Sequence, residues 1–185
     1  MIVALIIIVV ILIAMVAYPI SVYNGLVKLR QETENAFSQI DVQLKRRYDL
    51  IPNLVETVKG YMKHEQETLE RVISARNRAV SASTVQQKAE AEGEVRAALG
   101  GLFALSEAYP DLRSNENMLS LQEELKSTEN KISFARQYYN NTVTAYNTKI
   151  QVFPASIIAN SSGFKPKDLF EIEDPIERQN VKVSF

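Results

Sequence analysis

The sequence predicts an all-α protein, in which an N-terminal transmembrane helix is followed by an antiparallel bundle of three to four long helices. Three observations support this fold class. No charged side chain precedes Lys28 in the 185-residue chain. The chain has only six glycines and six prolines, and residues 53–109 and 111–153 contain no proline, which is typical of long helices. Beyond the apolar start, apolar residues recur at steps of three and four. We therefore expect a transmembrane anchor at 1–20, a helical bundle at 21–153 and an irregular tail at 154–185.

The first element, from Met1 to Ile20, is an uncharged apolar run. A helix of about 20 apolar residues crosses the ~30 Å hydrocarbon core of a bilayer. The alternative is a cleaved signal peptide, which needs a basic start and a polar segment after a small-residue cleavage site. Neither is present, so we expect an uncleaved, single-pass anchor. Lys28 and Arg30 follow the run, and the positive-inside rule then favours a cytoplasmic bundle, with extracytoplasmic placement as the alternative.

The next helical segment contains Pro52, which admits two interpretations. Apolar residues keep a helical spacing on both sides of the proline, which suits one longer, kinked helix. Alternatively, Asp49 caps a new helix and Pro52 lies in its tolerated first turn. We favour a break, because Asp49 and Pro52 together supply a stop and a start.

Two further helices are expected downstream. Residues 81–94 are small and polar, and we expect them to hold a turn and the start of a helix that continues through 95–108. The clearest pattern lies in 118–153, where a heptad step from Met118 meets only apolar or aromatic residues and predicts a coiled-coil-like face. These are Met118, Leu125, Ile132, Tyr139, Tyr146 and Phe153. Ser114 or Asn115 can cap this helix, and Pro154 ends it.

The composition argues against catalysis and against nucleic-acid binding. The chain has no cysteine and one histidine, which excludes thiolate and multi-histidine metal sites. No Gly-rich phosphate loop and no Gly-x-Ser-x-Gly nucleophile motif occurs. A net charge of -1 lacks the basic excess of proteins that grip nucleic acids. We expect no enzymatic activity, no cofactor and no nucleic-acid partner.

Two polar features stand out. Tyr139-Asn140 recurs seven residues later as Tyr146-Asn147. These pairs can bury the rings and use the phenol and amide groups for hydrogen bonds between helices; a partner surface is the alternative. The basic run from Lys45 to Arg47 is expected to be solvated and ion-paired, and contact with anionic lipid headgroups is the alternative.

Several ordered motifs resemble the LemA family of bacterial membrane proteins. They include Ile40-Asp41-Val42-Gln43-Leu44-Lys45-Arg46-Arg47-x-Asp49-Leu50-Ile51-Pro52-Asn53-Leu54-Val55, then Leu125-x-x-Thr128-Glu129-Asn130-x-Ile132, and Ala135-Arg136-Gln137-x-Tyr139-Asn140. The resemblance implies a single-pass protein of the bacterial cell (inner) membrane with an antiparallel helical bundle and no established enzymatic activity. One branch of that family is implicated in building magnetosome membranes. Some similar proteins begin with a lipoprotein-type signal, which would place the bundle outside the cytoplasm.

The shared polar residues are expected to serve the architecture. Asp49 fits a cap at a helix junction, and Arg47 or Arg136 can pair with Glu129 or Asp49 across the bundle and so fix the helix register.

Our leading hypothesis is a non-enzymatic, membrane-anchored assembly, scaffold or adaptor protein. We expect a homo-oligomer, with membrane lipids and an unidentified membrane protein as further partners. The alternatives are a lipid-binding or membrane-remodelling module and a regulatory partner of a membrane protease.

Overall fold

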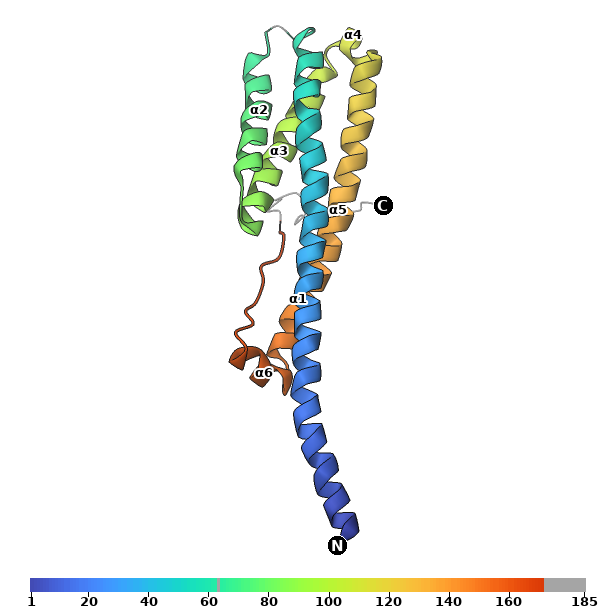
Figure 1. Ribbon diagram of the computed structural model, residues 1–185. Helices are drawn as coiled ribbons and strands as arrows, with labels where there is room; N and C mark the ends of the chain where they lie inside the picture. Colours follow the sequence, from blue (N-terminus) through green and yellow to red (C-terminus); the bar gives the residue numbers. More distant parts are fainter. Residues whose placement is uncertain (63, 172–185) are drawn as a thin grey trace, which may run out of the picture. The chain divides into compact units, whose positions relative to one another are not determined.

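A computed structural model of the chain describes residues 1–62 and 64–171, and over this range the predicted all-α class is confirmed. The helices are α1 (Ile2–Lys59), α2 (Gln66–Ser81), α3 (Val85–Ser106), α4 (Pro110–Arg113), α5 (Glu116–Gln151) and α6 (Ala155–Ser161) (Figure 1). The part of the predicted tail from residue 172 onward lies outside the described residues.

Helix α1 runs through Pro52 without interruption, so the favoured break at Asp49–Pro52 is wrong. The helix continues because its apolar face continues: Ile51, Leu54, Val55 and Val58 are all buried. Burial of this face outweighs the cost of a proline in a helix interior, which is about 3 kcal/mol. Asp49 consequently caps no helix and is an exposed residue of α1.

Short connections and local caps set the other helix boundaries. Three residues separate α2 from α3, and Thr84 starts α3 with a capping box: its hydroxyl accepts from the Gln87 N–H, while the Gln87 side chain accepts from the Thr84 N–H. At the start of α5, Asn115 Oδ1 accepts from the Met118 N–H at 3.1 Å, which confirms Asn115 as the cap. Short connections favour antiparallel neighbours.

The chain divides into two compact units. The first unit comprises residues 1–39 and 137–169, and the second comprises, among the described residues, 40–136 together with 170–171. In the second unit, the parts of α1 and α5 that it contains pack with α2 and α3 (Figure 1). Its buried apolar side chains include Leu44, Ile51, Val72, Val95, Leu102, Leu125 and Ile132.

The first unit has its own core, which joins the start of the bundle portion of α1 to the end of α5 and to α6. The core residues are Val22, Leu26, Tyr146, Ile150, Ala155, Ala159 and Phe164. The sequence predicts irregular structure from residue 154, whereas residues 155–161 form α6. The helix forms there because Ala155 and Ala159, four residues apart, face this core.

The heptad positions of α5 are buried within the chain itself. Met118, Leu125, Ile132, Tyr139 and Tyr146 are each at most 4% exposed, whereas Phe153 is 80% exposed. The heptad residues from Met118 to Tyr146 therefore form part of the interior of this chain.

Residues 1–20 of α1 are exposed throughout, and nearly all of them are apolar. Among the described residues, α1 is the one helix long and apolar enough to cross a membrane, and its most apolar section contributes nothing to either core. The predicted anchor is thus a candidate membrane span by length, composition and exposure.

Candidate functional site

A buried ion cluster lies in the second unit and joins three helices. Arg47 of α1 is only 5% exposed, and its Nη1 atom lies 3.0 Å from Glu92 Oε2 of α3 and 2.6 Å from Glu129 Oε2 of α5. Glu129 also lies near Arg96, with 3.9 Å between its Oε1 and the Arg96 Nε atom. One guanidinium thus pairs with two carboxylates from different helices, and this fixes how the three helices align.

Tyr48 completes the cluster from the next position on α1. Its hydroxyl donates a hydrogen bond of 2.5 Å to Glu92 Oε1. Burial raises the pKa of Glu92, although the nearby Arg47 and the Tyr48 hydrogen bond oppose that shift. Burial and the Glu92 carboxylate also raise the pKa of Tyr48, so its phenol stays protonated and remains a donor.

A second contact in the same unit explains how α1 tolerates Pro52. A proline has no N–H, so the carbonyl of Tyr48, four residues earlier, lacks its usual helical donor. Arg76 of α2 supplies one: its Nε donates to the Tyr48 carbonyl at 3.3 Å. The proline therefore opens a polar site on α1, and an arginine from the neighbouring helix occupies it.

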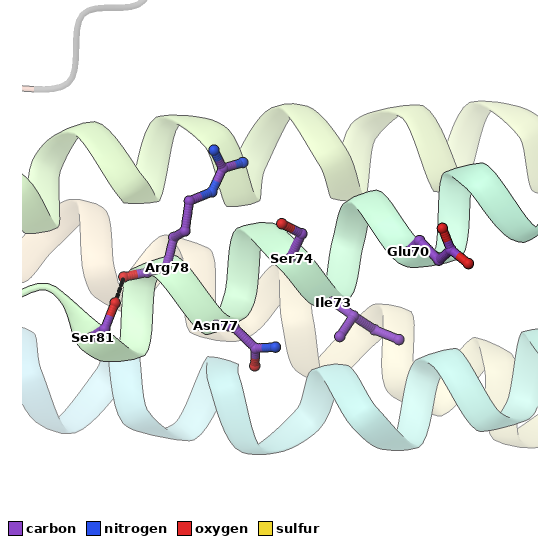
Figure 2. A pocket seen from close by; sticks show the side chains of 6 residues that line it. All are labelled: Glu70, Ile73, Ser74, Asn77, Arg78 and Ser81. Carbon is purple, nitrogen blue, oxygen red and sulfur yellow. Dashed lines mark hydrogen bonds between the residues drawn. The ribbon is translucent and has the colours of Figure 1, made fainter.

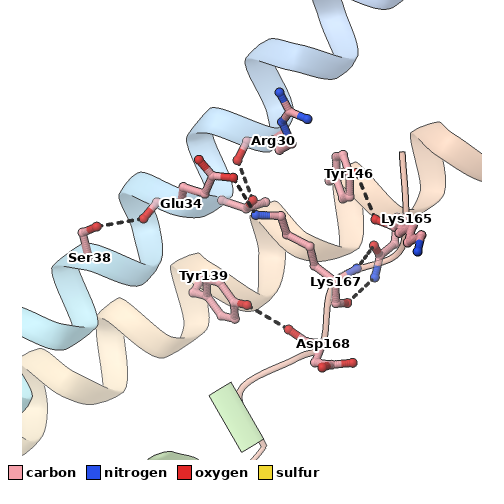
Figure 3. A network of polar contacts seen from close by, with 10 residues as sticks. Arg30, Glu34, Ser38, Tyr139, Tyr146, Lys165, Lys167 and Asp168 are labelled. Carbon is pink, nitrogen blue, oxygen red and sulfur yellow. Dashed lines mark hydrogen bonds and ion pairs between the residues drawn. The ribbon is translucent and has the colours of Figure 1, made fainter. Parts of the chain in front are cut away.

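Tyr139, Tyr146 and Asn147 of α5 hold the C-terminal strap, which we define as residues 164–169, in the first unit (Figure 3). Tyr146 donates to the Lys165 carbonyl at 3.0 Å, and Tyr139 donates to the Asp168 carbonyl at 2.9 Å. Asn147 makes two bonds to Lys167: its Nδ2 donates to the carbonyl at 2.8 Å, and its Oδ1 accepts from the N–H at 2.9 Å. The rings are buried as predicted, but the hydrogen bonds go to strap backbone instead of to another helix.

An ion pair ties the strap to α1 within the same unit. The Lys167 ammonium lies 3.1 Å from Glu34 Oε1. Burial raises the pKa of both Tyr139 and Tyr146, so both phenols remain hydrogen-bond donors near neutral pH.

The other predicted residues have separate places. Arg136 lies with its guanidinium 5.8 Å from the centre of the Phe170 ring, while Asp49 pairs with Lys45 one helical turn away. The predicted pairing across the bundle thus holds for Arg47 with Glu129 and not for Arg136 or Asp49. Asn140 is partly buried on α5.

The basic run 45–47 is ion-paired as predicted, but the prediction that it is solvated holds only for Lys45 and Arg46, because Arg47 is buried. Lys45 pairs with Asp49, and the Arg46 Nη2 atom lies 3.7 Å from Glu124 Oε2. Arg47 is buried in the ion cluster. These partners leave little free positive charge for lipid headgroups at this run.

Sequence reasoning missed Tyr48, Arg76 and Glu92. For Glu92 a signal existed: it precedes Val95 by three residues and Leu99 by seven, so it lies on the apolar stripe of α3. A carboxylate on such a stripe indicates a buried partner. No comparable sequence pattern indicates the role of Arg76, because that role depends on how α2 packs against α1.

A shallow, open depression of about 480 Å³ lies on the surface of α2 (Figure 2). All of its lining residues come from this helix: Glu70, Ile73, Ser74, Asn77, Arg78 and Ser81. Within residues 1–62 and 64–171, no group of three or more histidine, cysteine or acidic side chains is placed to hold a metal ion.

A family model that describes the LemA family matches residues 36–185, which include the ion cluster, Pro52, Arg76 and the strap. The chain belongs to the LemA family. It is 28% identical to Protein LemA of Metamycoplasma hominis over 166 residues, which cover 87% of this chain and 74% of that protein. It is also similar to two magnetosome proteins: MamQ 2 of Paramagnetospirillum magneticum (25% identical, 86% of this chain, 68% of that protein) and MamQ of Magnetospirillum gryphiswaldense (24% identical, 80% and 64%).

The LemA relatives' names specify no reaction. Membership of the LemA family and the candidate span together indicate a membrane-associated helical protein.

Proposed function

We propose that this protein is a non-enzymatic scaffold or adaptor that is anchored in the bacterial cell membrane and assembles laterally with copies of itself. The observation that carries the proposal is an exposed stripe on α2 that presents two apolar side chains, which we call the α2 stripe. Ile73 is 41% exposed and Val80 is 52% exposed. Asn77 lies between them, and the three residues share one face at steps of four and three.

The α2 stripe is a better candidate contact than the heptad stripe of α5. The heptad residues of α5 from Met118 to Tyr146 are buried inside the chain, and the exposed Phe153 lies beyond the end of α5. The α2 stripe lies on the outside, and its Ile73 and Asn77 line the depression on α2 together with charged residues such as Glu70. Two copies related by a two-fold axis would place identical stripes against each other, which is the commonest arrangement in soluble homo-oligomers.

Light scattering of the full chain in detergent at micromolar concentration tests self-association. We expect a mass of at least two chains for the wild-type protein and a single chain for the double variant Ile73→Asp/Val80→Asp. Val42→Asp is the matched control, because Val42 is an exposed valine of α1 at 64%, and it should leave the mass unchanged. A monodisperse wild-type monomer would contradict the proposal.

We propose that the bundle faces the cytoplasm, on the basis of Lys28 and Arg30 after the span. Because the chain contains no cysteine, a single Ser83→Cys change gives one labelling site. Residue 83 is exposed between α2 and α3. A membrane-impermeant maleimide should label it only after the cells are permeabilised, and labelling of intact spheroplasts would place the bundle outside.

A further inference from the structure

The corner between α5 and α6 exposes large apolar side chains at one end of the first unit. Val152 is 44% exposed, Phe153 is 80% exposed and Ile157 is 61% exposed. Ala155 and Ala159, from the same stretch of chain, are buried in the core of the first unit. The corner is therefore fixed to the unit on one side and turns an apolar surface outward on the other.

This corner lies where the candidate span ends. Its buried residues share a core with Val22, which is two residues beyond Ile20 and hence only about 3 Å further along a helix. The packing of α1 against α5 also places the corner at the level where the candidate span ends. The Phe37 and Tyr139 rings are 5.5 Å apart, Phe153 follows Tyr139 by fourteen residues, and Tyr23 precedes Phe37 by fourteen. Figure 1 shows α6 beside α1, just above the exposed N-terminal section of α1.

The charges around the corner suit an anionic lipid surface. Residues 1–31 and 137–167, which form most of the first unit, contain no aspartate or glutamate. The same residues contain five basic side chains, Lys28, Arg30, Lys149, Lys165 and Lys167, of which Lys167 pairs with Glu34. The rest of the first unit adds three acidic residues, Glu32, Glu34 and Asp168, so the unit keeps a net positive charge. Basic residues next to a span are attracted to anionic headgroups, and the exposed Tyr18 and Tyr23 have the character of interfacial aromatic residues.

We propose that the α5–α6 corner is a second membrane-contact element, which inserts Phe153, Val152 and Ile157 into the headgroup boundary of a bilayer that contains anionic lipid. The proposal rests on the membrane anchor of the proposed function but not on self-association. With the corner inserted, the first unit has two attachments to the bilayer, and the end of α5 is fixed against the surface from which α1 emerges.

Depth measurements with single-cysteine variants test this contact. The full chain is reconstituted in vesicles of three parts phosphatidylcholine to one part phosphatidylglycerol, and an environment-sensitive nitrobenzoxadiazole probe is attached to Phe153→Cys or Ile157→Cys. We expect blue-shifted emission that lipids with a shallow doxyl group quench. Thr144→Cys is the matched control, because it is exposed on α5 nine residues before Phe153, and its probe should report water.

A probe at Ile8→Cys separates failure of this proposal from failure of the anchor. If Ile8 reports hydrocarbon while Phe153 and Ile157 report water, the corner does not contact the membrane and the anchor stands. If Ile8 also reports water, both the anchor and the corner contact are wrong.

A second copy of the chain could instead cover the corner. In that event the Phe153 probe would be shielded from water yet unaffected by doxyl lipids, and Phe153→Cys would form disulfide-linked dimers, which would overturn the proposal. As a further check, Phe153→Asp introduced beside the Ile157 probe should return that probe to water. The unfolding temperature should stay unchanged, because the Phe153 side chain makes little contact with the protein.

Discussion

Arg47 is the residue on which the alignment of three helices depends. It is buried between Glu92 and Glu129, and its removal would leave two carboxylates without their shared cation. Breaking a buried ion pair by removing one partner costs about 3–5 kcal/mol, although replacing the whole cluster by apolar groups is often neutral. The cluster is therefore better understood as a device that selects one helix register than as a large source of stability.

We expect Arg47→Met to lower the free energy of unfolding by about 3–5 kcal/mol, and the further changes Glu92→Leu and Glu129→Leu to restore much of it. Circular dichroism during denaturant unfolding of the full chain in detergent measures both effects. The exposed Lys45→Met is the control and should change stability by under about 1 kcal/mol. Equal stability of Arg47→Met and wild type would contradict the assigned role of the ion cluster.

Glu92 makes the stability depend on pH in a direction that its burial determines. Its pKa is raised in the folded protein, chiefly by desolvation, so the folded state binds its proton more tightly than the unfolded state does. Its contribution to stability is then fully present below the ordinary pKa of a glutamate and is lost as pH rises through the raised value.

Glu92→Gln removes this titration. We expect the wild-type protein to lose stability relative to Glu92→Gln as the pH increases from about 4 upward. Denaturant unfolding at a series of pH values measures the difference between the two proteins. A difference that does not change with pH, or that changes in the opposite direction, would show that burial does not control this carboxyl group.

At the scale of elements, Pro52 shows how a neighbouring helix can compensate for a local defect. The proline leaves the Tyr48 carbonyl without a helical donor, and Arg76 of α2 donates to it. Removal of the arginine side chain should cost roughly 1 kcal/mol where the proline is present. Replacing the proline alone should stabilise α1 by up to about 3 kcal/mol, because alanine restores the missing N–H.

A double-mutant cycle with Pro52→Ala and Arg76→Met tests this coupling. Arg76→Met should destabilise the wild-type background more than the Pro52→Ala background, because in the latter the substituted alanine supplies its own N–H to the Tyr48 carbonyl. The expected coupling is about 1 kcal/mol, measured by unfolding in detergent. Equal effects of Arg76→Met in the two backgrounds would mean that Arg76 does not compensate for the proline.

In the strap, as at the Tyr48 carbonyl, side chains from another element form hydrogen bonds with backbone groups that lack a backbone partner. It has no regular secondary structure, so its backbone polar groups need other partners. Tyr139, Tyr146 and Asn147 of α5 provide them. The sequence reveals that the Tyr-Asn pairs are unusual, but the strap to which they bond lies 19 to 29 residues further along the chain and has no pattern of its own.

For the molecule as a whole, the features with a period or a length could be predicted from sequence. The apolar run of 1–20, the heptad stripe from Met118 and the turn at 82–84 all follow from spacing, composition or capping chemistry. The features that depend on contacts between distant parts of the chain could not be predicted from sequence. The continuity of α1 through Pro52, the partners of Glu92 and the strap contacts arise only once the chain packs, because each involves groups distant in sequence.

The anchored bundle has its own cores complete and leaves apolar side chains exposed at several places, among them α2 and the α5–α6 corner. We propose that the α2 stripe is the surface through which copies of the chain assemble. Disulfide crosslinking in native membranes tests this directly, because the chain has no cysteine of its own. Val80→Cys should yield a crosslinked dimer under mild oxidation, whereas Val42→Cys, which is at least as exposed, should remain monomeric. If Val80→Cys remains monomeric, or if both variants crosslink equally, assembly through α2 is contradicted.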